Sequence, residues 1–584
     1  MNSQVCEIFR GIPKSIICNF AHKYTWLMLT KVLKQFYYFL AAIFVLNILQ
    51  STFTELIFDE AYYWYYSQNM AWGYFDHPPM VALLIKISSF FFNGELGVRF
   101  MSCILSALNI LLLWFMIDNP KKTAYIPHFF VLVFSMTLLN AYGFFTLPDT
   151  PLLFFTSCFL LAYKNFIKKP NVGIALVLGL FMAALMYSKY HAVLVIFFVL
   201  LSNLKLVTNK YASLAVLVAL LCYAPHFYWL FDNDLVSIKY HLYERPNGAY
   251  SFEKYTLGFF VNLVAIFGLT FPFIYKALFK TKGTDLFNRA LLFLTYGVLL
   301  FFFVSSFNRR IQTQWIIIIC IPMIIIAYNY MLKNDQALKW IFRLGVINTI
   351  LIIYLRMGLI YQPLLFNFYY ETHGNKEWAM AIQKEVGSKP VVFENSYRNA
   401  PMYSFYTDGT PTYSFNNIFY RKNQYSIDDS EEVIRGKDVS YISKYINDHS
   451  FTIEKGNGGL YKGKYIDNFQ SFRGLECIIE ETKIRLNSNN EIPLAVYNPY
   501  PEAIDLQKLK FAVTYLDPHK TPMQTLPITI SPLKTDTQTL LPKDTTNFRF
   551  TLPKTNQKDI GFFRVVISEN NLYYGLNGKA IPVE

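Results

Sequence analysis

Charged residues are scarce in this chain. Only 16% of its 584 residues are Asp, Glu, Lys or Arg, whereas a soluble domain has roughly 25%. Hydrophobic residues make up 54% and aromatic residues 18%, and the mean hydropathy is +0.27. This composition excludes a wholly soluble protein and predicts a polytopic membrane protein with a soluble portion attached.

The net charge of +14 does not indicate nucleic-acid binding. The basic residues are spread among loops between apolar runs, where they set membrane topology and contact anionic lipid headgroups. Nucleotide-binding fingerprints are also missing, because neither G-x-G-x-x-G nor a Walker loop occurs. The sequence therefore favours membrane lipids as partners and excludes nucleic acid.

Cysteine is rare outside the apolar runs. Of the seven cysteines, only Cys477 lies in the polar C-terminal third, which therefore has no internal disulfide and no cysteine metal site. The first strong apolar run starts near Phe36 and no small-residue cleavage site follows it, so we expect no cleavable signal peptide.

Long hydrophobic runs are abundant. A transmembrane helix needs about 17–25 mostly apolar residues. The short run at 78–92 follows Pro78 and Pro79 and is better explained as an interfacial or re-entrant helix. The predicted spans are 36–57, 97–117, 124–145, 150–166, 171–188, 190–204, 211–231, 255–275, 287–306, 315–331 and 341–363.

The distribution of lysine sets the predicted topology. With the N-terminus in the cytoplasm, every inside loop is basic, as the positive-inside rule requires. Counting 78–92 as a span would move Lys121, Lys122 and every later cluster to the wrong face. We therefore expect about eleven spans in a plasma (inner) membrane, with the C-terminal third outside the cytoplasm.

The first outside loop carries an unusual set of polar residues. Asp59 and Glu60 directly follow the first span, and Tyr62, Tyr74 and His77 come shortly after them. Carboxylates at a lipid boundary lose hydration, so they usually mark a substrate or ion site. The alternative is that the two acids cap a short interfacial helix.

Other outside loops carry acids, histidines, arginines, amides and aromatic residues, whereas the inside loops carry mostly lysine. This mixture is the inventory of a polar site, and ionisable groups next to membrane spans are candidates for function. The further candidates are Asp149, Lys189, Tyr190, His191, His241, Arg245, Arg309, Arg310, Gln314 and Trp315.

The composition becomes polar from about Tyr370, where long apolar runs stop. Helical spacing at 376–386, a short strand at 390–394 and a helix at 400–406 predict a small α/β unit. Beyond Leu475, hydrophobic and polar residues alternate, which predicts a β-sandwich that positions or binds a partner. Its expected strands are 482–486, 494–497, 509–515, 547–552 and 561–567.

The predicted fold is therefore mainly α, with a helical membrane domain and two extracytoplasmic domains. Their expected boundaries are 1–365 for the membrane domain, 366–472 for the α/β domain and 473–584 for the β-sandwich. All candidate site residues fall in loops of the membrane domain, on its predicted outer face.

Together the candidates suit glycosyl transfer from a lipid-phosphate sugar. A carboxylate at an aqueous opening is able to act as a general base on an incoming hydroxyl or amine. Arginine and lysine at the membrane surface hold a phosphate, arginine bidentately, and tyrosine and tryptophan offer flat faces to a sugar. A lipid-linked donor also agrees with the missing nucleotide fingerprint.

Five motifs in order carry a family resemblance: DEAYYW at 59–64, GYFDHPP at 73–79, LPD at 147–149, SKYH at 188–191 and QW at 314–315. Over roughly residues 35–320 the chain resembles the family 39 glycosyltransferases. These include the protein O-mannosyltransferases and the lipid A aminoarabinose transferases, which have the GT-C fold. The resemblance implies a polyprenyl-phosphate sugar donor (undecaprenyl phosphate in bacteria) and an inverting reaction at the outer face. It also implies an acceptor that is lipid A, a protein or another envelope glycan.

The resemblance implies roles for individual residues. Asp59 is similar to the family's first-loop acid, the general base or acceptor-orienting group, with Glu60 as its partner. Asp149 is similar to the second loop acid, and Lys189 and Arg310 to ligands of the donor phosphate. The structural alternatives are a helix N-cap for Asp149 and a snorkelling interfacial lysine for Lys189.

A metal cofactor is a further expectation left open. His77 and His241 are candidates to share a divalent ion, because the lipid A enzymes use a Glu/His pair. Their spacing matches no metal motif, and a lone histidine is more often a hydrogen-bonding residue. The loop with Arg309, Arg310 and Gln314 departs from the His-Trp ending of some family members.

Three other functions compete with a lipid-dependent transferase. A flippase or transporter would place charges near mid-bilayer and show repeated halves, whereas the ionisable residues cluster at one face and no repeat is evident. A non-catalytic envelope scaffold would leave Asp59, Glu60 and Arg310 unexplained. A ligase or polymerase that uses a pyrophosphate-linked glycan donor would have similar chemistry at the outer face, so only the order of the motifs disfavours it.

Overall fold

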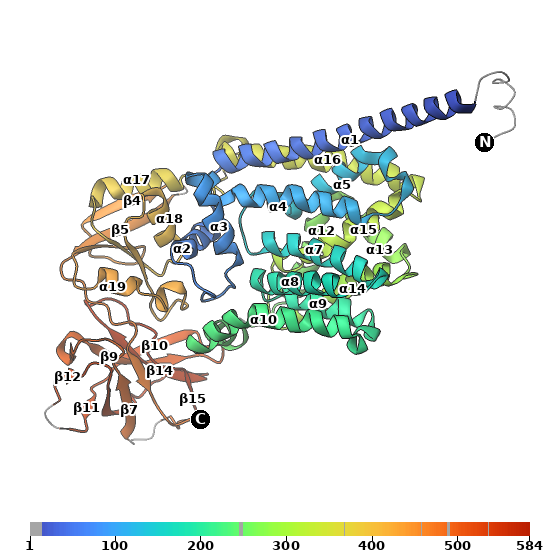
Figure 1. The fold of residues 1–584 in the computed structure, drawn as a ribbon. Helices are drawn as coiled ribbons and strands as arrows, with labels where there is room; N and C mark the ends of the chain where they lie inside the picture. Colours follow the sequence, from blue (N-terminus) through green and yellow to red (C-terminus); the bar gives the residue numbers. More distant parts are fainter. Residues whose placement is uncertain (1–13, 245–248, 367, 457, 487–490, 535–536) are drawn as a thin grey trace.

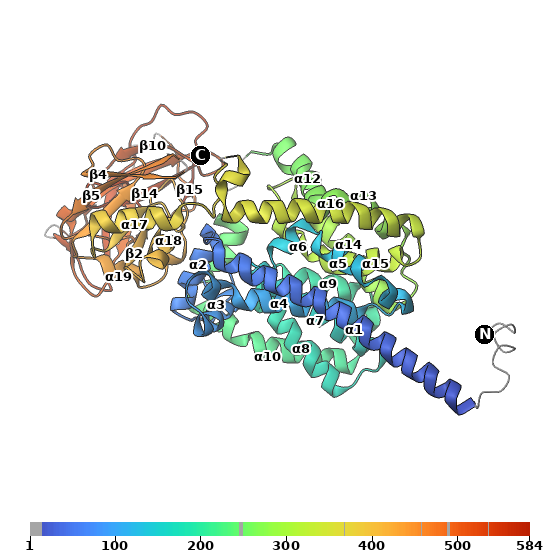
Figure 2. The ribbon, with the colours of Figure 1, turned by 90° about the horizontal axis from the view of Figure 1, so that it is seen from above.

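The computed structural model describes residues 14–244, 249–366, 368–456, 458–486, 491–534 and 537–584. The chain forms a bundle of helices with two further domains at one end (Figure 1). In both views α2 and α3 lie between the bundle and these domains (Figure 2). A mainly helical membrane domain followed by sheet-containing domains is the fold class that the sequence predicts.

The bundle contains the apolar runs. Its helices are α1 (Lys14–Phe53), α2 (Phe58–Gln68), α3 (Met80–Phe91), α4 (Gly94–Met116), α5 (Ile126–Phe134), α6 (Thr137–Ala141), α7 (Asp149–Lys168), α8 (Val172–Ser188), α9 (Ala192–Leu201), α10 (Lys210–Asp232), α11 (Val236–Lys239), α12 (Gly258–Phe267), α13 (Phe271–Lys280), α14 (Leu286–Ser305), α15 (Cys320–Met331) and α16 (Asp335–Ile360).

Within the described ranges, seven helical stretches are long and apolar enough to cross a bilayer. They correspond to α1, α4, α7, α10, α12 with α13, α14 and α16. Shorter apolar helices include α3, α8, α9 and the stretch ending in α15. The expected number of eleven spans stays a prediction.

The stretch leading into α15 forms the centre of the bundle. From Ile316 to Ala327 its hydrophobic side chains are at most 3% exposed. A helix that is apolar on every side belongs in the interior. Helices on the outside of the bundle, such as α10 and α16, instead expose large apolar side chains such as Leu221 and Ile350, as lipid-facing helices do.

One expected span is interrupted. The run 124–145 forms α5 and α6, separated at Ser135 and Met136, and neither piece has the length of a span. The freed carbonyl groups find partners within the bundle: Asn348 donates to Ser135 O, and Asn140 Nδ2 donates to Phe134 O at 3.2 Å. A break inside a bundle is tolerated where other side chains satisfy the backbone in this way.

The first loop folds into α2 and α3. α3 buries Val81, Ala82 and Ile85 and exposes Leu83 and Phe90. With 12 residues it is too short to span a bilayer upright, and its apolar exposed side suits the interfacial helix expected at 78–92. α2 begins five residues after α1 ends, at the edge of the bundle.

The α/β domain is built on a five-stranded sheet in the order β2-β1-β3-β5-β4. β1 pairs in parallel with β2 and β3, whereas β5 pairs antiparallel with β3 and β4. α17 and α18 confirm the expected helices, and β1 confirms the expected strand. Its elements are α17 (Asn375–Val386), β1 (Val391–Glu394), α18 (Asn399–Tyr406), β2 (Thr412–Phe415), α19 (Ser430–Ile434), β3 (Val439–Ser443), β4 (Phe451–Lys455) and β5 (Gly459–Ile466).

The hydrophobic core of the α/β domain continues into the membrane domain. Tyr62 and Tyr66 of α2 belong to the same buried cluster as Trp378 and Tyr403. α18 also packs directly on α2. The first loop is therefore held between the bundle and the α/β domain.

The last domain is a sandwich of two four-stranded sheets, in the orders β10-β9-β14-β15 and β11-β13-β7-β6. Four of the five expected strand segments lie in β7, β9, β13 and β14. The expected strand at 482–486 is wrong: only Ile484 forms an isolated bridge, to Val583. The strands are β6 (Glu476–Ile478), β7 (Glu491–Tyr497), β8 (Ile504–Asp505), β9 (Lys510–Leu516), β10 (Pro522–Pro527), β11 (Ser531–Pro532), β12 (Thr539–Leu540), β13 (Thr545–Thr551), β14 (Phe562–Ser568) and β15 (Ile581–Pro582).

Candidate active site

The two adjacent acids of α2 have different surroundings. Glu60 is fully buried and accepts hydrogen bonds from Arg99 Nε at 2.8 Å and Nη2 at 2.5 Å. It also accepts from the backbone nitrogens of Thr146 at 2.9 Å and Ile57 at 3.2 Å. A carboxylate in the first turn is favourable to the helix dipole. Glu60 therefore ties the start of α2 to α4 and to the loop before α7.

Asp59 is only half-buried, and its carboxylate has no ion pair or hydrogen bond to another side chain in the described part of the chain. Burial raises the pKa of Asp59 above its ordinary value, and the charge of Asp76 acts in the same direction. The positive charges of Arg398, Arg421 and Lys189 act against this rise. Asp59 thus lies among three cations without being bound to any of them.

Asp76 is held by two partners. Its Oδ1 accepts a hydrogen bond from Tyr66 Oη at 2.6 Å, and its Oδ2 accepts two from Arg421 at 3.3 Å. Burial opposes ionisation, but the charges of His77 and Arg421 and the Tyr66 hydrogen bond outweigh it, so the pKa of Asp76 lies below its ordinary value. Asp76 is therefore an anion at neutral pH and anchors a side chain from the α/β domain.

Asp149 and Lys189 form a buried ion pair. Lys189 Nζ donates to both carboxylate oxygens of Asp149 at 2.8 Å, and the two residues are 5% and 3% exposed. Asp149 is the first residue of α7, and the N-cap position is occupied by Pro148, so Asp149 is not the N-cap residue considered above. Lys189 follows α8, so the pair joins the ends of α7 and α8 on the side of the α/β domain.

A series of ring contacts extends from α2 across the site. The ring centroids of Tyr63 and His77 are 5.5 Å apart, those of His77 and His241 6.4 Å, and those of His241 and Tyr190 5.7 Å. His226 Nδ1 donates to the Trp72 carbonyl, so its Nε2 is left to accept from Tyr190 Oη at 3.2 Å. The first loop, the end of α8, the helix α10 and the stretch around His241 are thus in contact with one another.

Two predicted tyrosines have structural contacts. Tyr62 Oη accepts from the backbone nitrogen of Gln424 at 2.8 Å, and Tyr74 Oη donates to Tyr66 O at 2.9 Å. Both side chains are at most 2% exposed. They pack the first loop against its neighbours.

The loop after α14 contacts the end of α8 through Trp315. Arg310 is exposed, Arg309 is half-buried, and Gln314 Nε2 donates to Gln312 Oε1 at 3.1 Å. Trp315 lies 5.5 Å from His191, ring to ring, and so connects this loop with the end of α8. Arg245 lies outside the described residues.

His77 and His241 are not part of a group of three metal-binding side chains in the described ranges. Among the residues that the structure describes, no three His, Cys, Asp or Glu side chains are grouped to hold an ion. His241 Nε2 donates to the Asp76 carbonyl at 2.9 Å, and the Asp76 carboxylate already accepts from Tyr66 and Arg421. We therefore assign no step to a metal here.

Sequence reasoning missed the arginines that the α/β domain contributes. The guanidinium of Arg421 lies 4.4 Å from the ring centre of Tyr397 and 5.0 Å from that of Tyr240. Arg398 lies 5.8 Å from the ring of Phe58 and interacts with the charge of Asp59. Each arginine directly follows a tyrosine in the sequence. These two Tyr-Arg pairs are the feature by which the sequence could have indicated the arginines.

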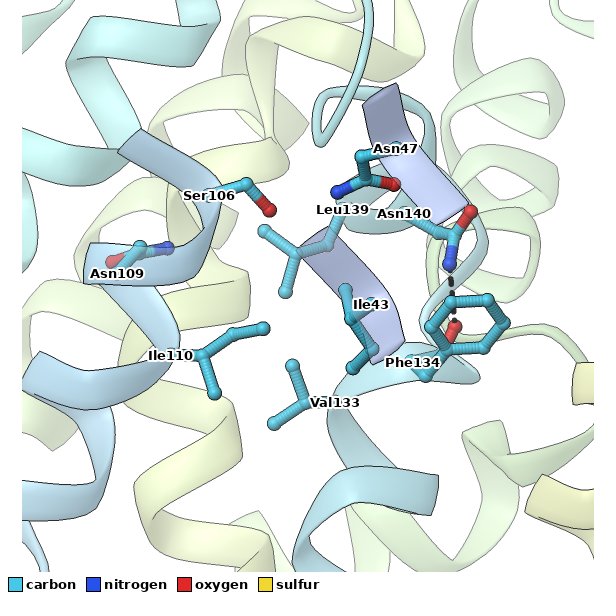
Figure 3. A pocket seen from close by; sticks show the side chains of 9 residues that line it. All are labelled: Ile43, Asn47, Ser106, Asn109, Ile110, Val133, Phe134, Leu139 and Asn140. Carbon is cyan, nitrogen blue, oxygen red and sulfur yellow. Dashed lines mark hydrogen bonds between the residues drawn. The ribbon is translucent and has the colours of Figure 1, made fainter. Parts of the chain in front are cut away.

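A small cavity inside the bundle lies apart from this site. It is about 30 Å³ and is bordered by polar side chains of α1 and α4, including Asn47 and Ser106, as well as by Ile110 and Val133 (Figure 3). Asn47 and Asn140 both accept hydrogen bonds from the buried Arg356. This volume suits about one water molecule, so it is not a substrate site.

Comparison with solved structures identifies the architecture. ArnT from Cupriavidus metallidurans in the apo state superimposes with a TM-score of 0.50, covering 72% of this chain and 93% of that chain at 12% identity. ArnT bound to undecaprenyl phosphate gives a TM-score of 0.51, covering 73% and 97% at 12% identity. The chain therefore has a GT-C-like fold.

Sequence comparison agrees with the GT-C assignment. Residues 76–229 match the sequence profile of the dolichyl-phosphate-mannose-protein mannosyltransferase family. The lipid A galacturonosyltransferase RgtD of Rhizobium johnstonii is 26% identical over 196 residues, which are 32% of this chain. The match covers 41% of that relative, so the chain spans about two fifths of the length of the curated relative that it matches.

Proposed function

We propose that this protein transfers a sugar from a polyprenyl-phosphate donor to an acceptor hydroxyl or amine, with Asp59 as the general base. The observation that carries the proposal is the contrast among four acids in one cluster. Glu60, Asp76 and Asp149 are each bound to a cation, whereas Asp59 forms no ion pair with any residue in the described ranges. A half-buried carboxylate with a raised pKa and no partner is suited to accept a proton.

In this reaction Asp59 removes the proton of the acceptor, whose oxygen or nitrogen attacks the anomeric carbon of the sugar. The bond from that carbon to the phosphate oxygen breaks, and the polyprenyl phosphate leaves with the bonding electrons. Attack from the side opposite the phosphate inverts the anomeric configuration. The proton taken from the acceptor remains on Asp59, which becomes a carboxylic acid.

The leaving phosphate requires positive charge close to the reacting sugar. Arg398 and Arg421 supply charge beside Asp59 from the α/β domain, and Arg421 is oriented by Asp76 and two tyrosine rings. Arginine suits a phosphate because its planar group offers parallel donors. We propose these two arginines as phosphate ligands, together with Arg310 if the loop after α14 contacts the donor.

The ion pair of Lys189 with Asp149 supports a different role from the one implied by the family resemblance. Each oxygen of Asp149 accepts from the same ammonium group at 2.8 Å. Breaking such a buried pair would leave an uncompensated charge. We propose that both residues position the site, and that Lys189 adds to the positive field around Asp59.

The donor and topology are proposed on separate grounds. ArnT in complex with undecaprenyl phosphate, and the mannosyltransferase family that residues 76–229 match, support a polyprenyl-phosphate carrier. The basic loops support placing the site and the C-terminal domains on the outer face of the plasma membrane. The acceptor class stays open among lipid A, protein and envelope glycan, and the name of the Rhizobium relative favours lipid A.

The test uses purified full-length protein in nanodiscs, radiolabelled polyprenyl-phosphate sugars and an envelope extract. We expect one acceptor to become labelled, and Asp59→Asn to abolish labelling. The matched control is Asp448→Asn, which removes a carboxylate that is 95% exposed in the α/β domain. Full activity of Asp59→Asn would overturn the assigned base, and a wild-type protein that labels no acceptor from any donor would overturn the function.

A further inference from the structure

A second cavity lies at the opposite end of the membrane domain. α7 starts at Asp149 beside the candidate site and runs for 20 residues, which is about 30 Å of helix. The cavity is formed around the far end of α7, where Phe166 meets the end of α9 and the start of α14. Its volume is about 580 Å³, within the range of about 300–1,000 Å³ that is typical of small-molecule sites.

The cavity carries positive charge and no acid. Among the side chains that line it in the described structure, Lys205 and Arg289 are cationic and none is Asp or Glu. The nearby carboxylate of Asp285 is engaged with Asn288, whose backbone nitrogen donates to it at 2.9 Å. Lys205 is exposed and not committed to an ion pair in the described chain.

One of the hydrogen-bond donors that Arg289 brings to the cavity is unpaired in the described structure. Its Nε is buried and has no hydrogen-bond partner within the part of the chain that is described. A buried donor left unpaired is unfavourable by about 1–3 kcal/mol, so an acceptor that reaches this nitrogen would bind favourably. An anionic oxygen is the acceptor that a guanidinium binds most strongly.

The surroundings of the cavity are apolar and exposed. Leu201 is 40% exposed, Leu204 65% and Phe293 39%, and all three border the cavity. In a membrane domain, exposed apolar side chains of this kind contact acyl chains. The cavity therefore combines a cationic interior with a lipid-facing rim.

We propose that this cavity binds the headgroup of an anionic phospholipid in the leaflet opposite the C-terminal domains. Arg289 and Lys205 contact the phosphate, Arg289 through its unpaired Nε, and the acyl chains lie along Leu201, Leu204 and Phe293. Basic pockets between transmembrane helices are suited to acidic headgroups for this reason. A dissolved phosphate has the same charge but gains nothing from the apolar rim, so the geometry favours the lipid.

The experiment measures lipids retained by the full-length protein in native mass spectrometry, using phosphatidylglycerol and phosphatidylcholine as probes. We expect the wild type to retain phosphatidylglycerol in preference to phosphatidylcholine. In Arg289→Gln and in Lys205→Gln this retention should be about fivefold weaker, because each cation contributes about 1 kcal/mol of attraction to an anionic headgroup. Arg289→Lys should keep part of the retention. The matched control is Lys339→Gln on α16, which removes an exposed lysine that does not line the cavity and should change nothing.

Thermal unfolding in a neutral detergent separates binding from folding. The proposal requires that Arg289→Gln unfolds at the wild-type temperature without lipid, because Nε has no partner to lose among the residues that the structure describes. It also requires that phosphatidylglycerol stabilises the wild type more than the variant. If Arg289→Gln and Lys205→Gln retain as much phosphatidylglycerol as the wild type and the control Lys339→Gln, the proposed site is wrong. Displacement of the lipid by millimolar inorganic phosphate would overturn its assignment as a lipid headgroup site. Unfolding of Lys205→Gln, an exposed residue, would also contradict it.

Discussion

Arg421 of the α/β domain donates from both terminal nitrogens to Asp76 Oδ2, each at 3.3 Å, across 345 residues of sequence. The side chains of the pair are 18% and 10% exposed. The α/β domain is thus bound to the first loop of the membrane domain at the side of Asp59. The α/β domain therefore contributes a side chain, that of Arg421, to the candidate site.

We expect Arg421→Gln to lower transfer at least tenfold. The substitution removes a phosphate ligand and frees Asp76, whose pKa would rise because a nearby positive charge is lost. Breaking a fully buried pair costs about 3–5 kcal/mol, and the partial exposure of this pair makes about 2 kcal/mol the reasonable expectation. Steady-state transfer and thermal unfolding measure the two effects.

The control for this substitution is Arg549→Gln. Its pair with Glu491 joins side chains that are 56% and 62% exposed in the β-sandwich, so its loss should leave both transfer and stability unchanged. Arg421→Lys keeps the charge but loses the two parallel donors, and should recover only part of the activity. If Arg421→Gln transferred sugar at the wild-type rate, Arg421 would not be a ligand of the phosphate.

Asp59 predicts a pH dependence with a definite sign. Its pKa is raised above 3.8 by burial, and the base must be ionised to accept a proton. We therefore expect kcat/KM of the wild type to rise with pH on an acid limb that lies above the ordinary range of an aspartate. Initial rates between pH 4 and 8, taken on the protein in nanodiscs, test it.

The same shift predicts the effect on stability. A carboxyl whose folded-state pKa is raised stabilises the fold only while it is protonated, and that stabilisation is lost as pH rises through the folded pKa. Asp59→Asn should therefore be as stable as the wild type at pH 7, or more stable, although it is inactive. A large drop in its unfolding temperature would assign Asp59 a structural role.

Glu60 is expected to behave in the opposite way. Glu60→Gln leaves the buried Arg99 without its carboxylate, and should destabilise the fold by about 3–5 kcal/mol. The double substitution Glu60→Gln with Arg99→Met should recover part of this loss, because no unpaired charge stays buried. Expression level and thermal unfolding of the three variants measure the coupling. Additive losses would show that the pair is not a unit.

Lys455 predicts a second pH effect, at the junction of the domains. It is 4% exposed, and its Nζ lies 4.7 Å from the ring of Phe58 in α2. Burial lowers its pKa from 10.5 to about 8, against the opposing charge of Glu55. Folding therefore favours the neutral amine, and the free energy of unfolding should rise as pH increases from about 8 towards 10.

Lys455→Met tests this sign directly. The variant buries no ammonium group, so we expect it to be at least as stable as the wild type at pH 7 and to lose the rise above pH 8. Thermal unfolding at a series of pH values gives the comparison. Lys389→Met, on the surface of the same domain, is the control and should keep the rise. A wild type whose stability falls between pH 8 and 10 would contradict the prediction.

Part of this architecture could be derived from local sequence because it depends on neighbouring residues. The spacing of apolar residues in 376–386 and the alternation in 561–567 determine which face of each element is buried, and both elements form as expected. The break in 124–145 could not be foreseen, since Asn348 satisfies the freed carbonyl of Ser135 from a helix more than 200 residues away.

The sequence by itself determined that acids, histidines and arginines lie in loops between membrane helices, because hydrophobic length and lysine distribution are properties of the chain. It did not decide which acid is available. Asp59 and Glu60 are adjacent, yet only the folded chain brings Arg99 to Glu60 and leaves Asp59 among Arg398, Arg421 and Lys189. A carboxylate's reactivity depends on burial and on charges within a few ångströms, and those distances are set by tertiary packing.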